Sequence, residues 1–167
     1  NLPSLSGLDE GTTAPNFTGT SICDGKPIDL HELAKNHRGI IITFFRGSWW
    51  VECHSFFTRL QPDLEYFQNE DVLIIGVSGD RADKLKERMC NYKLTMLSDL
   101  PKHNIAITYN AFTYYEQPVD NWTRKVKINQ PITYLINPEG KIVWKFVGTR
   151  EIRPPNNTLK DAVEKYL

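Results

Sequence analysis

The apolar residues of this chain form two kinds of run. Residues 39–45 and 72–77 are β-branched or aromatic with almost no polar interruption, the pattern of strands buried on both faces of a sheet. Between them, apolar residues recur at three- and four-residue steps, which predicts a helix with one buried stripe. The stripe consists of Phe56, Phe57, Leu60, Leu64 and Phe67. Pro62 lies inside this stripe and predicts a kink.

Shorter segments predict the remaining elements. Strands are expected at 17–22, 26–29, 95–97, 132–136 and 141–147, and helices at 30–35, 80–92, 101–109 and 157–167. Strands that alternate with helices and end in a hairpin and a helix indicate an α/β sandwich. The sequence therefore predicts a mixed central sheet flanked by helices.

The length of 167 residues suits one domain spanning 1–167. Residues 1–15 are polar and predict an extended lead-in. Residues 111–125 have no clean period, and we interpret them as an elaborated loop that carries Tyr114, Tyr115 and Trp122.

Composition narrows the function classes. Lys plus Arg and Asp plus Glu number 20 each, so charge favours neither nucleic acid nor an anionic membrane as a partner. The longest apolar run, 39–45, is too short to cross a bilayer. Three cysteines are too few for a disulfide scaffold, so we favour a cytoplasmic location. The chain begins at Asn1 rather than Met, which leaves export after loss of a leader open.

The most informative stretch joins the strand at 39–45 to the helix that follows it. A Gly47-Ser48 turn leads to Cys53, which stands where the helix begins. The positive end of a helix dipole favours a thiolate there. Trp50 occupies the place where a Cys-x-x-Cys pair would have its first cysteine. Cys53 is thus predicted to be a single reactive thiol, with an inert, buried thiol as the alternative.

Several motifs, in this order and spacing, resemble the peroxiredoxin-like branch of the alkyl hydroperoxide reductase and thiol-specific antioxidant (AhpC/TSA) superfamily, which has the thioredoxin fold. The likeness covers residues 14–167. The motifs are Ala14-Pro15-Asn16-Phe17, Arg46-Gly47-Ser48-Trp49 followed by Cys53, Leu97-Ser98-Asp99, and Pro131 before the strand at 132–136.

The resemblance implies an antioxidant oxidoreductase in which the Cys53 thiolate attacks a peroxide O–O bond and becomes a sulfenic acid. Hydrogen peroxide or an organic hydroperoxide would be the substrate. A second thiol would complete the cycle, either Cys90 as a resolving cysteine that forms a disulfide with Cys53 or an external reductant such as thioredoxin or glutathione. The resemblance also implies that Pro131 is cis and faces the cysteine turn.

Two departures from the family pattern stand beside Cys53. Trp50 replaces a Thr whose hydroxyl would contact thiolate and peroxide, and an indole N–H donates but cannot accept. Arg46 replaces a Pro and can supply positive charge. We expect Arg46, Trp49, Trp50 and Pro131 to form the binding site, where Trp50 either plugs the site or walls a pocket.

Other interpretations stay open at this point. Cys90 can instead pack in the core beside Leu85 and Met89, and Cys23 at a hairpin turn is interpreted as a bystander. The whole chain can be a redox-inactive binding module with a Trp-lined cleft, or a one-thiol reductase that forms mixed disulfides. No His spacing predicts a metal site, and no Gly-rich phosphate loop or nucleotide motif predicts a cofactor.

Overall fold

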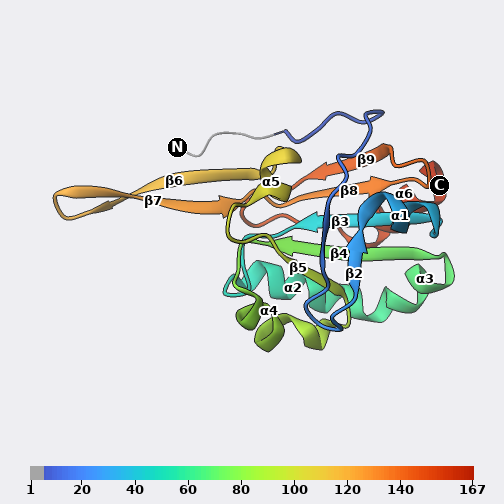
Figure 1. Ribbon diagram of the computed structural model, residues 1–167, viewed down its shortest axis with the longest axis horizontal. Helices are drawn as coiled ribbons and strands as arrows, with labels where there is room; N and C mark the ends of the chain where they lie inside the picture. Colours follow the sequence, from blue (N-terminus) through green and yellow to red (C-terminus); the bar gives the residue numbers. More distant parts are fainter. Residues whose placement is uncertain (1–5) are drawn as a thin grey trace.

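A mixed five-stranded sheet forms the centre of the computed structural model (Figure 1). The model describes residues 6–167, apart from the side chains of residues 114–116 and 127. The sheet order is β5-β4-β3-β8-β9, with β3 (Gly39–Phe44), β4 (Val72–Ser78), β5 (Thr95–Ser98), β8 (Ile132–Ile136) and β9 (Ile142–Val147). Strands β3, β4 and β5 are parallel, whereas β8 and β9 are antiparallel to their neighbours. The predicted mixed sheet is confirmed.

Helices cover both faces of this sheet, and every residue of β3 is buried as its apolar run predicts. One face packs against α2 (Val51–Leu60), α3 (Leu64–Asn69), α4 (Ala82–Met89) and α6 (Asn156–Tyr166). The other face packs against α1 (Leu30–Lys35) and α5 (Asn104–Thr108). The cysteine turn lies at the carboxyl end of β3, between the sheet and α2.

The kink predicted at Pro62 is present. A short 3-10 turn, η1 (Gln61–Asp63), separates α2 from α3 and has the proline near its start. Proline cannot donate the backbone hydrogen bond that an uninterrupted helix needs at that point. The stripe nevertheless stays buried: Phe56, Phe57, Leu60 and Phe67 are at most 2% exposed.

The first described residues run along the molecule before a small hairpin of β1 (Thr18–Thr20) and β2 (Pro27–Asp29). Backbone bonds tie this segment to the sheet, from Gly11 N–H to the Ile142 carbonyl and from Ile142 N–H to the Thr12 carbonyl. The described part of the lead-in predicted at 1–15 contains a turn near residues 10–12 and a single bridge from Thr13 to Lys141, and residues 1–5 lie outside the described residues.

Residues 111–125, interpreted as a loop, belong instead to a regular hairpin. Strands β6 (Phe112–Val119) and β7 (Trp122–Asn129) pair over eight residues each and project from the body as an arm (Figure 1). The turn at the tip has Asp120 in the left-handed backbone region, with φ of 51°. Asp tolerates that conformation because its short side chain can hydrogen-bond locally.

Candidate functional site

Cys53 lies in the first turn of α2, as the sequence predicts. Trp50 is the N-cap residue, and the backbone N–H of Cys53 donates to the Trp50 carbonyl at 3.1 Å. The Cys53 side chain is fully buried, with 0% exposure, and it is a free thiol. The fold thus places the sulfur at the positive end of a ten-residue helix, but out of contact with solvent.

Arg153 provides a cation at this buried sulfur. Its Nη2 lies 3.8 Å from Cys53 Sγ, and the residue is only 6% exposed. Its Nη1 donates to the backbone carbonyls of Thr149, Arg150 and Ile152 at 2.6, 3.4 and 3.1 Å. The backbone carbonyls of the loop after β9 therefore hold the Arg153 guanidinium and place it next to the Cys53 thiol.

Sequence reasoning missed Arg153. The only local signal is the run Arg153-Pro154-Pro155, in which two prolines stiffen the chain just before α6.

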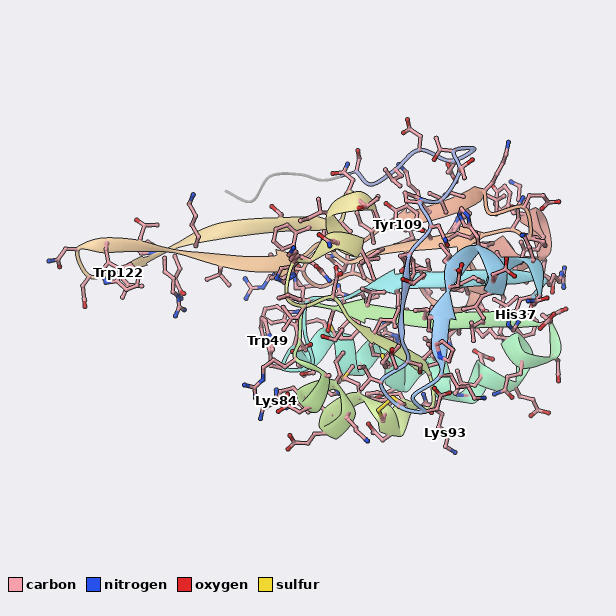
Figure 2. The ribbon with its side chains drawn as sticks, viewed as in Figure 1. His37, Trp49, Lys84, Lys93, Tyr109 and Trp122 are labelled. Atoms are coloured by element: carbon pink, nitrogen blue, oxygen red, sulfur yellow. A yellow bond between two sulfur atoms is a disulfide. The ribbon has the colours of Figure 1, made fainter. Side chains whose placement is uncertain are left out.

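Trp50 is half-buried and packs against the core cluster that contains Cys53. The guanidinium carbons of Arg46 and Arg150 lie 5.3 and 5.2 Å from the centre of the Trp50 ring, within cation–π range. Trp49 meets Trp50 edge-to-face at 5.2 Å and is 53% exposed at the end of the body near the base of the arm (Figure 2). Arg46, Trp49 and Trp50 are thus brought together around Cys53.

Trp122, which the sequence analysis places on the elaborated loop, is not part of this cluster. Trp122 is 58% exposed and lies near the far end of the arm (Figure 2). The side chains of Tyr114 and Tyr115 lie outside the described residues.

A hydrogen-bond chain fixes the start of α2 from the other side. His54 Nε2 lies 2.6 Å from the Ser48 carbonyl, which can only accept, so Nε2 carries the hydrogen. In the neutral ring His54 Nδ1 accepts from the Tyr92 hydroxyl, 2.5 Å away. Ser48 donates to the Asp80 carboxylate from its N–H at 2.7 Å and from its hydroxyl at 3.1 Å. The turn before Cys53 is therefore held rigidly by α4 and its flanking residues.

The first and third cysteines form a disulfide, Cys23–Cys90, with Cα atoms 5.5 Å apart (Figure 2). The bystander interpretation of Cys23 is wrong. Its turn follows β1, and the backbone N–H of Ile22 in that turn donates to the carbonyl of Met96 in β5, which places Cys23 beside the end of α4. Because Cys90 is already bonded to Cys23, the structure does not pair it with Cys53.

The prediction of a cis bond before Pro131 is wrong. In the described backbone the cis bond precedes Pro101. Pro131 is buried and opens β8 in trans, where its carbonyl accepts from Gly148 N–H at 2.8 Å and extends the β8–β9 pairing by one step. Trans is the intrinsically favoured form of an X–Pro bond. The bond from Gly148 N–H to the Pro131 carbonyl supports the start of the loop that carries Arg150 and Arg153.

A polar cavity of about 70 Å³ adjoins the cysteine turn. Arg46, Trp49, Asp80, His103 and Asn129 line it, and Cys53 is not among its lining residues. Among the side chains that the structure describes in residues 6–167, no group of three His, Cys, Asp or Glu is placed to hold a metal ion. No helix in the same range is long and apolar enough to cross a membrane.

Two curated proteins illustrate the sequence similarity of this chain to known proteins. The chain is 27% identical over 143 residues to the thiol-disulfide oxidoreductase ResA of Bacillus subtilis, covering 85% of this chain and 69% of the relative. It is 31% identical over 108 residues to the chloroplastic peroxiredoxin Q of Oryza sativa subsp. japonica, covering 59% and 48%.

Solved structures share the fold at low identity. Peroxidoxin BcpB from Mycobacterium tuberculosis superimposes with a TM-score of 0.71 at 14% identity, over 94% of this chain and 95% of that one. The 2-Cys peroxiredoxin of Plasmodium vivax superimposes with a TM-score of 0.71 at 20% identity, over 92% and 93%. The thioredoxin-like fold is therefore established. Residues 11–145 match the AhpC/TSA family, and the chain belongs to that family of thiol redox proteins.

Proposed function

We propose that the chain is a thiol peroxidase that reduces hydrogen peroxide or an organic hydroperoxide with Cys53. The observation that carries the proposal is the guanidinium of Arg153, 3.8 Å from Cys53 Sγ and buried with it. A cation held in a water-poor site stabilises negative charge on sulfur, and on the leaving oxygen, more than it would in water. A sulfur that only packed in the core would not need one.

The oxidation step consumes one peroxide per thiol. The Cys53 thiolate attacks the nearer peroxide oxygen, the O–O bond breaks, and a Cys53 sulfenic acid and an alkoxide or hydroxide form. The leaving oxygen takes a proton and departs as alcohol or water. Arg153 faces the sulfur throughout, so it is placed to offset the charge that moves from sulfur to oxygen.

The Trp50 side chain must move for a peroxide to reach the sulfur, since Cys53 has no exposed surface. The indole is held by aromatic and cation–π contacts with Trp49, Arg46 and Arg150. Such contacts contribute about 0.5–2 kcal/mol each. Displacing the ring is therefore an accessible local motion rather than unfolding of the core.

An external thiol completes the cycle in this proposal. With Cys90 bonded to Cys23, a reductant thiol condenses with the Cys53 sulfenic acid, releasing water and leaving a mixed disulfide. A second equivalent of reductant then exchanges with that disulfide and regenerates the Cys53 thiol. Thioredoxin or a low-molecular-weight thiol such as glutathione has the required chemistry.

The test is direct trapping of the oxidised sulfur. The protein with its disulfide intact is treated with one equivalent of hydrogen peroxide in the presence of dimedone and analysed by peptide mass spectrometry. We expect the adduct on Cys53 and none in a Cys53→Ser variant. Unmodified Cys53 after excess peroxide would end the peroxidase proposal.

The alternative is a redox-inactive binding module, and the complete burial of Cys53 is the observation that favours it. In that case Trp50 and its arginine neighbours form a recognition surface and the sulfur is a core atom. The Cys53→Ser variant then keeps ligand binding unchanged, whereas Trp50→Ala weakens it.

A further inference from the structure

We propose that the Cys53 site recognises a carboxylate, so that one of the two substrates of the proposed peroxidase carries this group. The inference rests on the proposed function where it calls the bound compound a substrate. The carboxylate site itself is argued from separate contacts. It concerns Arg150, Arg153 and Trp50.

The surroundings of Trp50 are strongly cationic. Arg46 and Arg150 stack on its ring, and Arg150 also accepts a hydrogen bond from Arg153 through its backbone carbonyl. The acid next to Arg150 does little to offset the charge of that side chain. The Arg150–Glu151 pair is long, at 3.8 Å, and both side chains are more than 60% exposed, so it is worth little.

Glu52 lies in the first turn of α2, and a second carboxylate near the turn, that of Asp80, is already committed. Asp80 accepts from the N–H and hydroxyl of Ser48 and from the hydroxyl of Ser78, at 2.7–3.1 Å. It therefore anchors the turn through these serine donors. The cationic cluster favours an incoming anion.

Two buried donors beside Cys53 have no acceptor among the described residues. They are Arg153 Nε and Trp50 Nε1, and Arg153 as a whole is 6% exposed. A buried donor without a partner costs about 1–3 kcal/mol, more for a charged group, so such groups call for an explanation. An acceptor-only ligand group at this site removes the cost, and a carboxylate offers acceptor oxygens in a plane that suits a guanidinium.

The position of Arg150 explains how the anion gains access. The Arg150 side chain is 64% exposed, so an anion meets it before it meets Arg153. A carboxylate that pairs with Arg150 competes with the stacking of that guanidinium on Trp50. Binding of the anion therefore loosens one of the contacts that keep Trp50 over the thiol, which couples recognition to exposure of Cys53.

Binding is measured without any redox step. Hexanoate and its neutral isostere hexanamide are titrated by calorimetry, and the indole N–H signals are followed by ¹H–¹⁵N NMR, with the Trp50 signal assigned from Trp50→Phe. We expect saturable binding of hexanoate, a shift of the Trp50 indole signal, and no such response to hexanamide. Arg150→Gln should weaken hexanoate binding about tenfold, the effect of 1.4 kcal/mol.

The matched control is Arg124→Gln, which removes the same charge from an exposed arginine on the arm. It should leave hexanoate affinity unchanged. Equal responses to the acid and the amide, or equal losses in Arg150→Gln and Arg124→Gln, would overturn the inference. Because Cys53→Ser can be titrated in the same way, hexanoate binding without peroxidase activity ends the proposed function alone, and activity without binding ends this inference alone.

Two rate comparisons identify which substrate carries the carboxylate. In the first comparison, 3-mercaptopropionate and 2-mercaptoethanol are compared as reductants of the Cys53 sulfenic acid. In the second, a carboxylate-bearing alkyl hydroperoxide is compared with its methyl ester as oxidant. A preference for the acid that is lost in Arg150→Gln assigns the carboxylate to that substrate, whereas no preference in either comparison would overturn its assignment to a substrate.

Discussion

Nη2 of Arg153 lies 3.8 Å from Sγ of Cys53, although 100 residues separate the two in sequence. Strand β9 ends beside the cysteine turn, and the loop that follows it folds over its own guanidinium before α6 begins. The thiol and its cation are thus fixed by different elements. Their relationship can be tested without moving the helix that holds the sulfur.

Replacing Arg153 by Met should slow oxidation of Cys53 by hydrogen peroxide about 100-fold, the effect of losing one preorganised donor. Arg153→Lys should keep more of the rate because the charge remains. The second-order rate constant is measured by stopped-flow with urea unfolding in parallel, since Arg153 also holds the loop. Arg59→Met, on the exposed side of α2, is the control. An unchanged rate in Arg153→Met would show that the guanidinium has no part in the reaction.

Trp50→Ala should expose Cys53 and increase its rate of reaction with the neutral reagent 4,4′-dithiodipyridine at least about tenfold, because each 1.4 kcal/mol of opening cost removed gives that factor. Trp49→Ala is the matched control, since Trp49 is 53% exposed and covers less of the site. Equal rates in wild type and Trp50→Ala would mean that another element seals the thiol.

Removing the Cys23–Cys90 disulfide should lower the free energy of unfolding by about 4 kcal/mol, the loop-closure estimate for a separation of 67 residues. The double variant Cys23→Ser, Cys90→Ser is compared with wild type by urea unfolding without reductant. Wild type should titrate one thiol under denaturing, non-reducing conditions, and two or more would contradict the pairing.

The free energy of unfolding should depend on Asp63 at low pH. Hydrogen bonds from Lys160, at 2.6 Å, and from Asn156, at 2.7 Å, hold the pKa of the Asp63 carboxyl below its usual value. Because the folded pKa is the lower one, the stabilisation is complete above the usual Asp range, near about 4, and is lost as pH falls through the folded pKa.

Asp63→Asn should accordingly be less stable than wild type at pH 7, and the difference should shrink on acidification below about pH 4. Urea unfolding at several pH values measures this. Lys160→Met should bring the Asp63 pKa, followed by NMR, back towards its usual value. A difference between Asp63→Asn and wild type that grows as pH falls would contradict the assigned sign.

Much of the fold could be predicted because its signals are local. The apolar runs of β3 and β4 and the stripe that begins in α2 are each contained in a dozen residues. Their periodicity within those residues indicates a buried strand or an amphipathic helix. The arm was missed because β6 and β7 do not alternate cleanly, and Asp120-Asn121 is a weaker turn signal than a pair that contains glycine.

The site was predictable only where it is contiguous. Arg46, Trp49, Trp50 and Cys53 lie in one turn, and their proximity follows from that. The disulfide depends on how the turn after β1 lies beside β5, and the cation at Cys53 depends on where a loop 100 residues away in sequence lies in the fold. The cis bond assigned to Pro131 came from resemblance alone, and no local signal in the sequence distinguishes Pro131 from Pro101, where the cis bond lies.

The β6–β7 arm gives the molecule a property that its compact body lacks. Its eight-residue strands pair with each other and extend away from the sheet, with Trp122 near the tip. A chain of this shape should diffuse more slowly than a sphere of equal mass. Limited proteolysis should cut first at the Asp120-Asn121 turn, leaving the five-stranded body intact.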